Sequence, residues 1–100
     1  MTVPVRFEPE ALDELDTAYV MYQALAPGLG DRLRGEFAAR IQVISEFPLA
    51  YPEWEGPARR TTLTRFPYSI FYRVYETEVR ILAVLYSRLD PAEVMRRVLG

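Results

Sequence analysis

The first residues of the chain alternate between apolar and other side chains, and a period of two is typical of a strand with one buried face. Residues 3–8 place Val3, Val5 and Phe7 on one side of such a strand. From Pro9 onward the apolar residues recur every three or four positions, which predicts an amphipathic helix. Its predicted core face comprises Leu12, Leu15, Tyr19, Tyr22 and Ala26. The chain is therefore expected to begin with a strand and a helix.

A second helix is predicted after a sharp turn. The turn is the segment APGLG at residues 26–30, whose proline and two glycines end the first helix. The second helix is predicted to run as far as Pro48. Its core face, again at helical spacing, comprises Leu33, Phe37, Ile41 and Ile44. Two helices joined by so short a connection are expected to form an antiparallel hairpin.

Three strands are predicted in the second half of the chain. They follow the segment PLAYPEWEGPA, whose three prolines and one glycine predict a loop at residues 48–58. The predicted strands span residues 60–65, 68–75 and 78–88. The last one contains VRILAVLY, a nearly continuous apolar run that is typical of a central strand covered on both faces. Pro91 is expected to open a short helix over residues 92–99.

The order strand, helix, helix, three strands and short helix predicts an α+β fold, in which a helical hairpin packs on one face of a mainly antiparallel β-sheet. One hundred residues, half of them apolar, fit a single domain over residues 1–100. No apolar run approaches the ~20 residues of a membrane helix, and the N-terminus lacks the features of a signal peptide. We therefore expect a soluble, cytoplasmic protein without a membrane partner.

The composition excludes several kinds of chemistry. The chain contains no cysteine and no histidine, which excludes disulfides, cysteine nucleophiles, Ser-His-Asp triads and zinc sites built from those residues. We expect no metal and no cofactor. The net charge is −2, and all twelve basic residues are arginine. Any affinity for anions must therefore come from local clustering of arginines.

The predicted hairpins place three arginines together. If both turns have two-residue loops, Arg60 lies opposite Arg73, and Arg73 lies opposite Arg80. The three guanidiniums then form a row on the sheet face that the helices leave uncovered. Like charges opposed on a sheet are destabilising, and two explanations stay open. The row binds phosphates or carboxylates of a partner, or water and nearby carboxylates neutralise it. The candidate carboxylates belong to Glu55, Glu76 and Glu78.

The same registers predict which apolar side chains lie beneath the helices. They are Leu63, Ile70, Tyr72, Val74, Val79, Ile81, Ala83 and Leu85. The opposite face is predicted to carry, beside the arginines, Thr62, Thr64, Phe71, Tyr75, Leu82, Val84 and Tyr86. A shift of one residue in either hairpin would exchange the two faces of a strand.

Five segments of the chain resemble, in order and spacing, the RelE/ParE superfamily of toxins from type II toxin–antitoxin modules. These segments are VRFEPEALDEL, APGLGDRLRGEF, ISEFPLAYPE, RRTTLTRFPYSIFYRV and ILAVLYSRLDP, and together they span nearly the whole chain. The resemblance implies a small bacterial toxin with the RelE/ParE-like α+β fold. It also implies a cognate ParD- or RelB-like antitoxin that binds the toxin in a hetero-oligomer.

The superfamily has two main classes of target. RelE-like members cut mRNA at the ribosome with arginine, lysine and a C-terminal tyrosine or similar group, whereas ParE-like members poison DNA gyrase and are not nucleases. In this chain Arg73 and Arg88 resemble arginines of the RelE-like pattern, but lysine is absent, and Met95 stands where that tyrosine is expected. Tyr86 stands where many relatives carry histidine, and a phenol with a pKa near 10 is a weak base at neutral pH.

The resemblance therefore favours a ParE-like toxin that binds and poisons DNA gyrase, since such a poison needs a binding surface rather than a general base. Two alternatives stay open: a RelE-like, ribosome-dependent mRNA endoribonuclease, and a family member with weak or lost toxicity. Whether the protein is an enzyme stays open with them, and no catalytic residue is assigned. The candidate residues for binding the target or the antitoxin are Arg60, Arg65, Arg73, Arg80, Arg88 and Tyr86.

Overall fold

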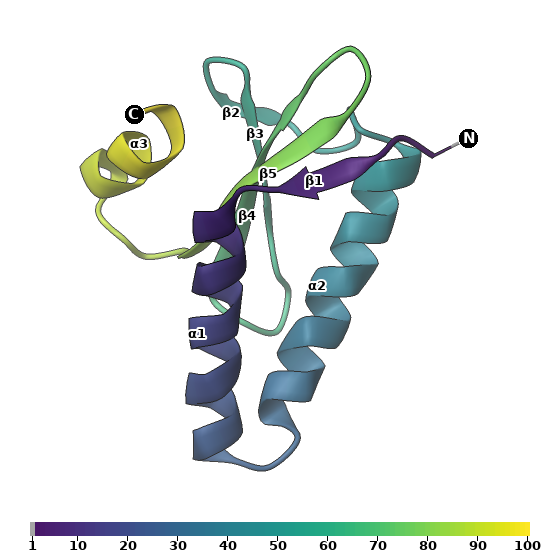
Figure 1. Cartoon of the computed structure of the whole chain (residues 1–100). Helices are drawn as coiled ribbons and strands as arrows, with labels where there is room; N and C mark the ends of the chain where they lie inside the picture. Colours follow the sequence, from purple (N-terminus) through teal and green to yellow (C-terminus); the bar gives the residue numbers. More distant parts are fainter. Residues whose placement is uncertain (1) are drawn as a thin grey trace.

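The computed structural model describes residues 2–100 and shows one β-sheet with a long helical hairpin and a shorter third helix (Figure 1). In chain order the elements are β1 (Val5–Phe7), α1 (Pro9–Leu25), α2 (Leu29–Glu46), β2 (Glu53–Glu55), β3 (Ala58–Thr62), β4 (Tyr68–Val74), β5 (Val79–Tyr86) and α3 (Pro91–Leu99). The predicted α+β fold and order of elements are confirmed. Within residues 2–100, no helix is long and apolar enough to span a membrane.

The prediction of a loop without regular structure at residues 48–58 is wrong in one place. This segment contains β2, which pairs with β3 at the edge of the sheet. The turn between these two strands includes Gly56, whose φ of 55° lies in the left-handed region that favours glycine. A strand of three residues is too short to produce a recognisable alternation, and the prolines on both sides of it favoured the prediction of a loop.

The helical hairpin is confirmed, and a glycine allows its two helices to approach closely. α1 ends before Pro27, and α2 follows Gly28, whose φ is 88°. A Cβ atom at Gly30 would lie 2.6 Å from the backbone oxygen of Tyr19, which is closer than such atoms can approach. The side-chain oxygen of Gln23 also accepts a hydrogen bond from the Gly30 N–H at 2.8 Å. The turn and the adjoining ends of both helices therefore form one tightly packed unit.

The predicted core face of α1 is only partly correct. Leu15 is buried, but the other buried residues of this helix are Ala11 and Ala18. Leu12 is 45% exposed, and Ala26 is exposed beyond the end of the helix. The small alanines let α1 lie close to the sheet, and a prediction based on the spacing of large apolar residues missed them.

The sheet has the strand order β1-β5-β4-β3-β2. β1 runs parallel to β5, and the other neighbours are antiparallel, so the sheet is mainly antiparallel as predicted. The hairpin packs on one face of the sheet and forms the main hydrophobic core with it. The most deeply buried members of this core are Leu33, Ile44, Ile70, Tyr72, Val79 and Ile81. The buried Tyr72 hydroxyl donates to the carbonyl oxygen of Pro48 at 2.8 Å, which satisfies its polar group.

A β-bulge changes which side chains of β5 face the hairpin. The register of β4 against β5 shifts between Phe71 and Tyr72, and Leu82 is the extra residue on β5. One extra residue moves every later side chain of a strand to the opposite face. The predicted faces are therefore wrong for Ala83, Val84 and Leu85. Val84 packs beneath the hairpin, whereas Ala83 and Leu85 lie on the other side of the sheet.

The third helix covers part of the sheet face that was predicted to be open. α3 follows Asp90, whose carboxylate accepts a hydrogen bond from the Ala92 N–H at 2.8 Å. Val94 of this helix packs against Phe71 and Leu85 in a second, smaller hydrophobic cluster. Both faces of the sheet are thus occupied, the first along the hairpin and the second beneath α3.

Candidate functional site

Three arginines from neighbouring strands lie in a row on the α3 side of the sheet. Arg73 of β4 is directly opposite Arg80 of β5, and Arg80 pairs in turn with Arg6 of β1. The predicted pairing of Arg73 with Arg80 is confirmed. Arg6 was not predicted in the row, because nothing in the local sequence of β1 reveals that it pairs in parallel with a strand more than seventy residues away.

Two carboxylates neutralise part of this row. A Glu78 carboxylate oxygen lies 3.1 Å from Arg6 Nε, the other lies 3.0 Å from Arg80 Nε, and Glu8 lies 3.7 Å from Arg80. The hydrogen bond to Glu78 and the charge of its carboxylate raise the pKa of the Arg80 guanidinium. Glu78 is therefore one of the predicted neutralising carboxylates. In residues 2–100 the other two candidates, Glu55 and Glu76, form no ion pair.

Arg73 differs from the other two arginines of the row because it forms no ion pair within residues 2–100. Its guanidinium lies 4.9 Å from the centre of the Tyr75 ring, which Arg80 approaches at 5.2 Å. Arg73 also lines a cavity of about 370 Å³, to which Leu82 and Val98 contribute apolar walls. An exposed guanidinium beside an apolar wall can bind an anionic group on an otherwise apolar partner surface.

Arg60 is not opposite Arg73, so this part of the prediction is wrong. Arg60 pairs with Phe71, and Ala58 occupies the position opposite Arg73. The prediction assumed a two-residue turn and a strand that continued to residue 65, but the connection between β3 and β4 spans residues 63–67. The register is therefore displaced by two residues. A displacement by two keeps Arg60 on the same face of the sheet but moves it out of the row.

Arg60 lies instead near the N-terminal end of α3, whereas the Arg73 cavity lies near its C-terminal end. Arg60 lines a small cavity of about 90 Å³ together with Trp54 and Tyr86. Trp54 packs edge-to-face on Phe71, with ring centres 5.1 Å apart, and thereby anchors β2 to the sheet. Tyr86 was predicted to share a face with the arginines, and this prediction is wrong because Tyr86 follows the bulge. It lies opposite Tyr68, and the centres of the two rings are 6.0 Å apart. Tyr68 packs against the core on the hairpin side of the sheet. α3 therefore separates an Arg60 cavity from an Arg73 cavity.

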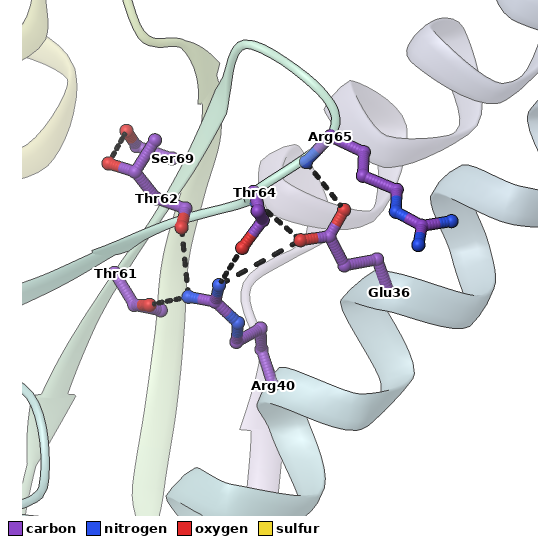
Figure 2. A network of polar contacts seen from close by, with 7 residues as sticks. All are labelled: Glu36, Arg40, Thr61, Thr62, Thr64, Arg65 and Ser69. Atoms are coloured by element: carbon purple, nitrogen blue, oxygen red, sulfur yellow. Dashed lines mark hydrogen bonds and ion pairs between the residues drawn. The ribbon is translucent and has the colours of Figure 1, made fainter.

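Arg65 and Arg88 line neither of these two cavities. Arg65 lies in the connection between β3 and β4, and Figure 2 shows its side chain extending toward α2. Arg88 is exposed in the turn between β5 and α3. Of the six candidate residues, the structure therefore brings Arg73 beside Arg80 and Arg60 near Tyr86, and it leaves the remaining two arginines apart.

Two residues of α2 that the sequence analysis did not single out hold the β3–β4 connection in place (Figure 2). Arg40 donates hydrogen bonds to the carbonyl oxygen of Thr62 at 2.8 Å and to the Thr64 hydroxyl at 2.9 Å. Glu36 accepts hydrogen bonds from the backbone N–H groups of Thr64 and Arg65. Burial disfavours the charge of Glu36, but these two N–H groups and the charge of Arg40 together lower its pKa. The only sequence signal was the spacing of an acidic and a basic residue by one helical turn.

The arrangement is better suited to binding anions than to moving protons. The chain contains no histidine and no lysine. Burial raises the pKa of Tyr68, so its hydroxyl stays protonated at neutral pH. Within residues 2–100, no three acidic, histidine or cysteine side chains are grouped so that they could hold a metal ion. The chemistry that the site offers is charge and forked hydrogen bonds from arginine, with aromatic and apolar surfaces beside them.

Residues 5–91 match the family model described as ParE toxin of type II toxin–antitoxin system, parDE. The chain belongs to the ParE toxin family. The match includes the hairpin and every strand of the sheet, and it confirms the predicted resemblance to the RelE/ParE superfamily. This ParE-family protein is therefore a toxin of a type II toxin–antitoxin system. The comparison with curated proteins found no matching sequence.

Solved structures share the fold of this ParE-family protein. The chromosomal ParDE system from P. aeruginosa has a TM-score of 0.72 at 23% identity, over 83% of this chain and 94% of that one. A mutant of the E. coli toxin RelE in the free state has a TM-score of 0.67 at 17% identity, over 99% and 96%. The toxin–antitoxin complex RelBE2 from Mycobacterium tuberculosis has a TM-score of 0.54 at 24% identity, over 90% and 95%. At these identities the similarity shows the fold alone.

Proposed function

We propose that this ParE-family protein binds and poisons DNA gyrase, and that a cognate ParD-like antitoxin neutralises it in a cytoplasmic hetero-oligomer. The observation that supports the choice of target is the match of residues 5–91 to the family of ParE toxins. A gyrase poison needs a binding surface and no general base. The absence of lysine and histidine from the chain supports the same choice.

The Arg73 cavity is the proposed contact with the target. Arg73 is exposed and forms no ion pair in residues 2–100, so a carboxylate or phosphate of a partner can approach it without displacing a partner within the chain. Arg80 stands directly beside it and is held in place by Glu78. Guanidiniums bind such anions with paired hydrogen bonds, which orient as well as attract.

The remaining candidate residues stay proposed contacts of the target or of the antitoxin. They are Arg60, Arg65, Arg88 and Tyr86. The similar ParDE and RelBE2 structures are described as toxin–antitoxin systems, which supports an antitoxin for this protein. Inducing the chain alone is expected to arrest bacterial growth, and expressing the neighbouring reading frame together with it is expected to relieve the arrest.

Two parallel assays with the purified chain test the choice of target. DNA gyrase is expected to lose supercoiling activity in the presence of the protein, while programmed ribosomes are expected to keep their mRNA intact. Cleavage of ribosome-bound mRNA with unimpaired gyrase would overturn the proposal in favour of the RelE-like alternative. No effect in either assay, together with no growth arrest on induction, would indicate a family member with weak or lost toxicity.

A further inference from the structure

A groove lies between α1 and the end of the sheet at which β4 begins and β5 ends. It has a volume of about 240 Å³. Its apolar base consists of Ala18 of α1 and of Val84 and Leu85 of β5, all of which are buried. Asp13 and Thr17 of α1 line the same groove and are exposed. The groove therefore combines an apolar base with a polar rim on the side of α1.

Two tyrosines line the groove on the side of the sheet. Tyr68 is the first residue of β4 and Tyr86 is the last residue of β5, and the two are paired across the strands. Their ring centres are 6.0 Å apart, and the Tyr68 ring also packs edge-to-face with the ring of Tyr22 at 6.1 Å. Tyr68 is therefore fixed between two other rings. Tyr86 is 40% exposed, so its ring remains accessible to a ligand. The faces of such rings attract cations.

The groove carries an uncompensated negative charge. Asp13 forms no ion pair within residues 2–100. The other carboxylate of the lining, that of Glu14, is compensated by its ion pair with Arg97. In the part of the chain that the structure describes, no arginine lines the groove. Arg60 lines the neighbouring cavity, which shares Tyr86 with the groove. A free carboxylate therefore lies in the same small groove as two aromatic rings.

We propose that this groove binds the side chain of an arginine on the surface of a protein partner. A guanidinium stacks on aromatic rings and forms forked hydrogen bonds with a carboxylate, so it can contact Tyr86 and Asp13 together. The methylene stem of the arginine covers the apolar base of the groove. A lysine fits less well, because its ammonium group is strongly hydrated and does not stack on a ring.

The size and exposure of the groove suit one side chain of a partner better than a free small molecule. Pockets for small molecules typically have volumes of about 300–1,000 Å³ and bury about 70–90% of the ligand surface. This groove is smaller, and Asp13, Thr17 and Tyr86 of its lining are exposed. The surface of a protein partner would complete the burial of the arginine. The groove shares no residue with the Arg73 cavity, so it can be tested independently of gyrase inhibition.

Tyrosine ring chemical shifts of the full chain, titrated with an arginine that is acetylated and methylamidated, test the proposal. The largest changes are expected at Tyr68 and Tyr86. Citrulline with the same caps has the shape of arginine without its charge, and it is expected to bind at least about fivefold more weakly. Equal binding of the two would overturn the proposal. Agmatine, a free alkylguanidinium, tests the other source of the same group. If it bound more than about tenfold more tightly than capped arginine, a small molecule would replace the proposed partner.

Two pairs of variants test the charge and the ring separately. Asp13→Asn is expected to weaken binding of capped arginine by about threefold. Its matched control, Glu10→Gln, removes a charge from an exposed position of the same helix outside the groove. The control is expected to change the affinity by less than about 1.5-fold, because salt screens distant charges. Tyr86→Leu is expected to weaken binding by about three- to fivefold, whereas Tyr86→Phe keeps the ring and most of the affinity.

Three results would each overturn the proposal. The first is equal affinity of Asp13→Asn and Glu10→Gln, and the second is equal affinity of the two Tyr86 variants. The third is a concentration-dependent dimer of this chain formed through the groove, because a second copy would then occupy the site. Asp13 and Tyr86 are exposed, so all four variants are expected to fold, and urea unfolding of each variant checks this expectation.

Discussion

Arg97 of α3 donates a hydrogen bond to the carboxylate of Glu14 on α1 at 2.8 Å, across 83 positions of sequence. The Nη2 amino group of the same guanidinium donates to the other oxygen of Glu14 at 3.0 Å and to the carbonyl of Leu82 at 3.1 Å. Glu14 in turn accepts a hydrogen bond from the N–H of Val84 at 3.0 Å. One ion pair therefore joins both faces of the sheet and satisfies two backbone groups at the β-bulge, the Leu82 carbonyl and the Val84 N–H.

Glu14→Ala is expected to destabilise the protein by about 1–3 kcal/mol, because it leaves the partly buried Arg97 and the Val84 N–H without their partner. Urea unfolding measures the loss, and faster hydrogen exchange is expected at the bulge and in α3. Asp16→Ala is the matched control, since the ion pair between Asp16 and Arg34 is exposed. The control is expected to change the stability by less than about 1 kcal/mol. Equal effects of the two substitutions would refute a special role for Glu14.

Gly30→Ala is expected to destabilise the protein by about 1–3 kcal/mol, because the added Cβ atom meets the backbone of Tyr19 at 2.6 Å and forces the helices apart. Gly35 lies in the same helix, and a Cβ atom added there would have nothing within 4 Å. Gly35→Ala is therefore expected to stabilise the protein by about 0.5–1 kcal/mol through helix propensity. Thermal unfolding of both variants measures this difference in sign, and two changes of the same sign would contradict it.

Glu36→Gln is expected to make the stability less dependent on pH in the acid range. The pKa of Glu36 in the folded protein lies below its ordinary value of 4.5. A carboxylate with a lowered pKa stabilises the fold above its unfolded-state pKa, and this contribution disappears as the pH falls through the folded-state pKa. The difference in unfolding free energy between the two proteins should therefore be largest near neutral pH and should shrink below about pH 4.5. A difference that grows on acidification would show that Glu36 acts in another way.

Arg73→Ala is expected to leave the stability unchanged within about 0.5 kcal/mol, because Arg73 is exposed and makes no ion pair in residues 2–100. The same substitution is expected to weaken gyrase inhibition by about tenfold or more, since a hydrogen bond to a charged group contributes about 1.5–3 kcal/mol. The matched control is Arg32→Ala, which removes an exposed arginine of α2. Equal potency of the two variants would remove Arg73 from the proposed contact surface, and unfolding of the first would show a structural role.

The sequence by itself determined the types of the long elements, their order and the fold class. Two local patterns carry this information: the helical spacing of Leu33, Phe37 and Ile44, and the apolar run of β5. The hydrophobic faces that they produce are buried most favourably against each other. Segments distributed along the chain also indicated a RelE/ParE-like toxin. The pairing of Arg73 with Arg80 was also predictable, because the short turn next to these residues sets their register.

Only the tertiary structure decided the registers farther from that turn. At the bulge, Glu14 accepts a hydrogen bond from the Val84 N–H and Arg97 donates one to the Leu82 carbonyl. The long connection that moves Arg60 out of the row is hydrogen-bonded to Glu36 and Arg40. These partners lie far away in sequence. The local sequence of a strand does not indicate that a remote side chain will bind one of its backbone groups. Pairing with a distant strand brought Arg6 into the row for the same reason.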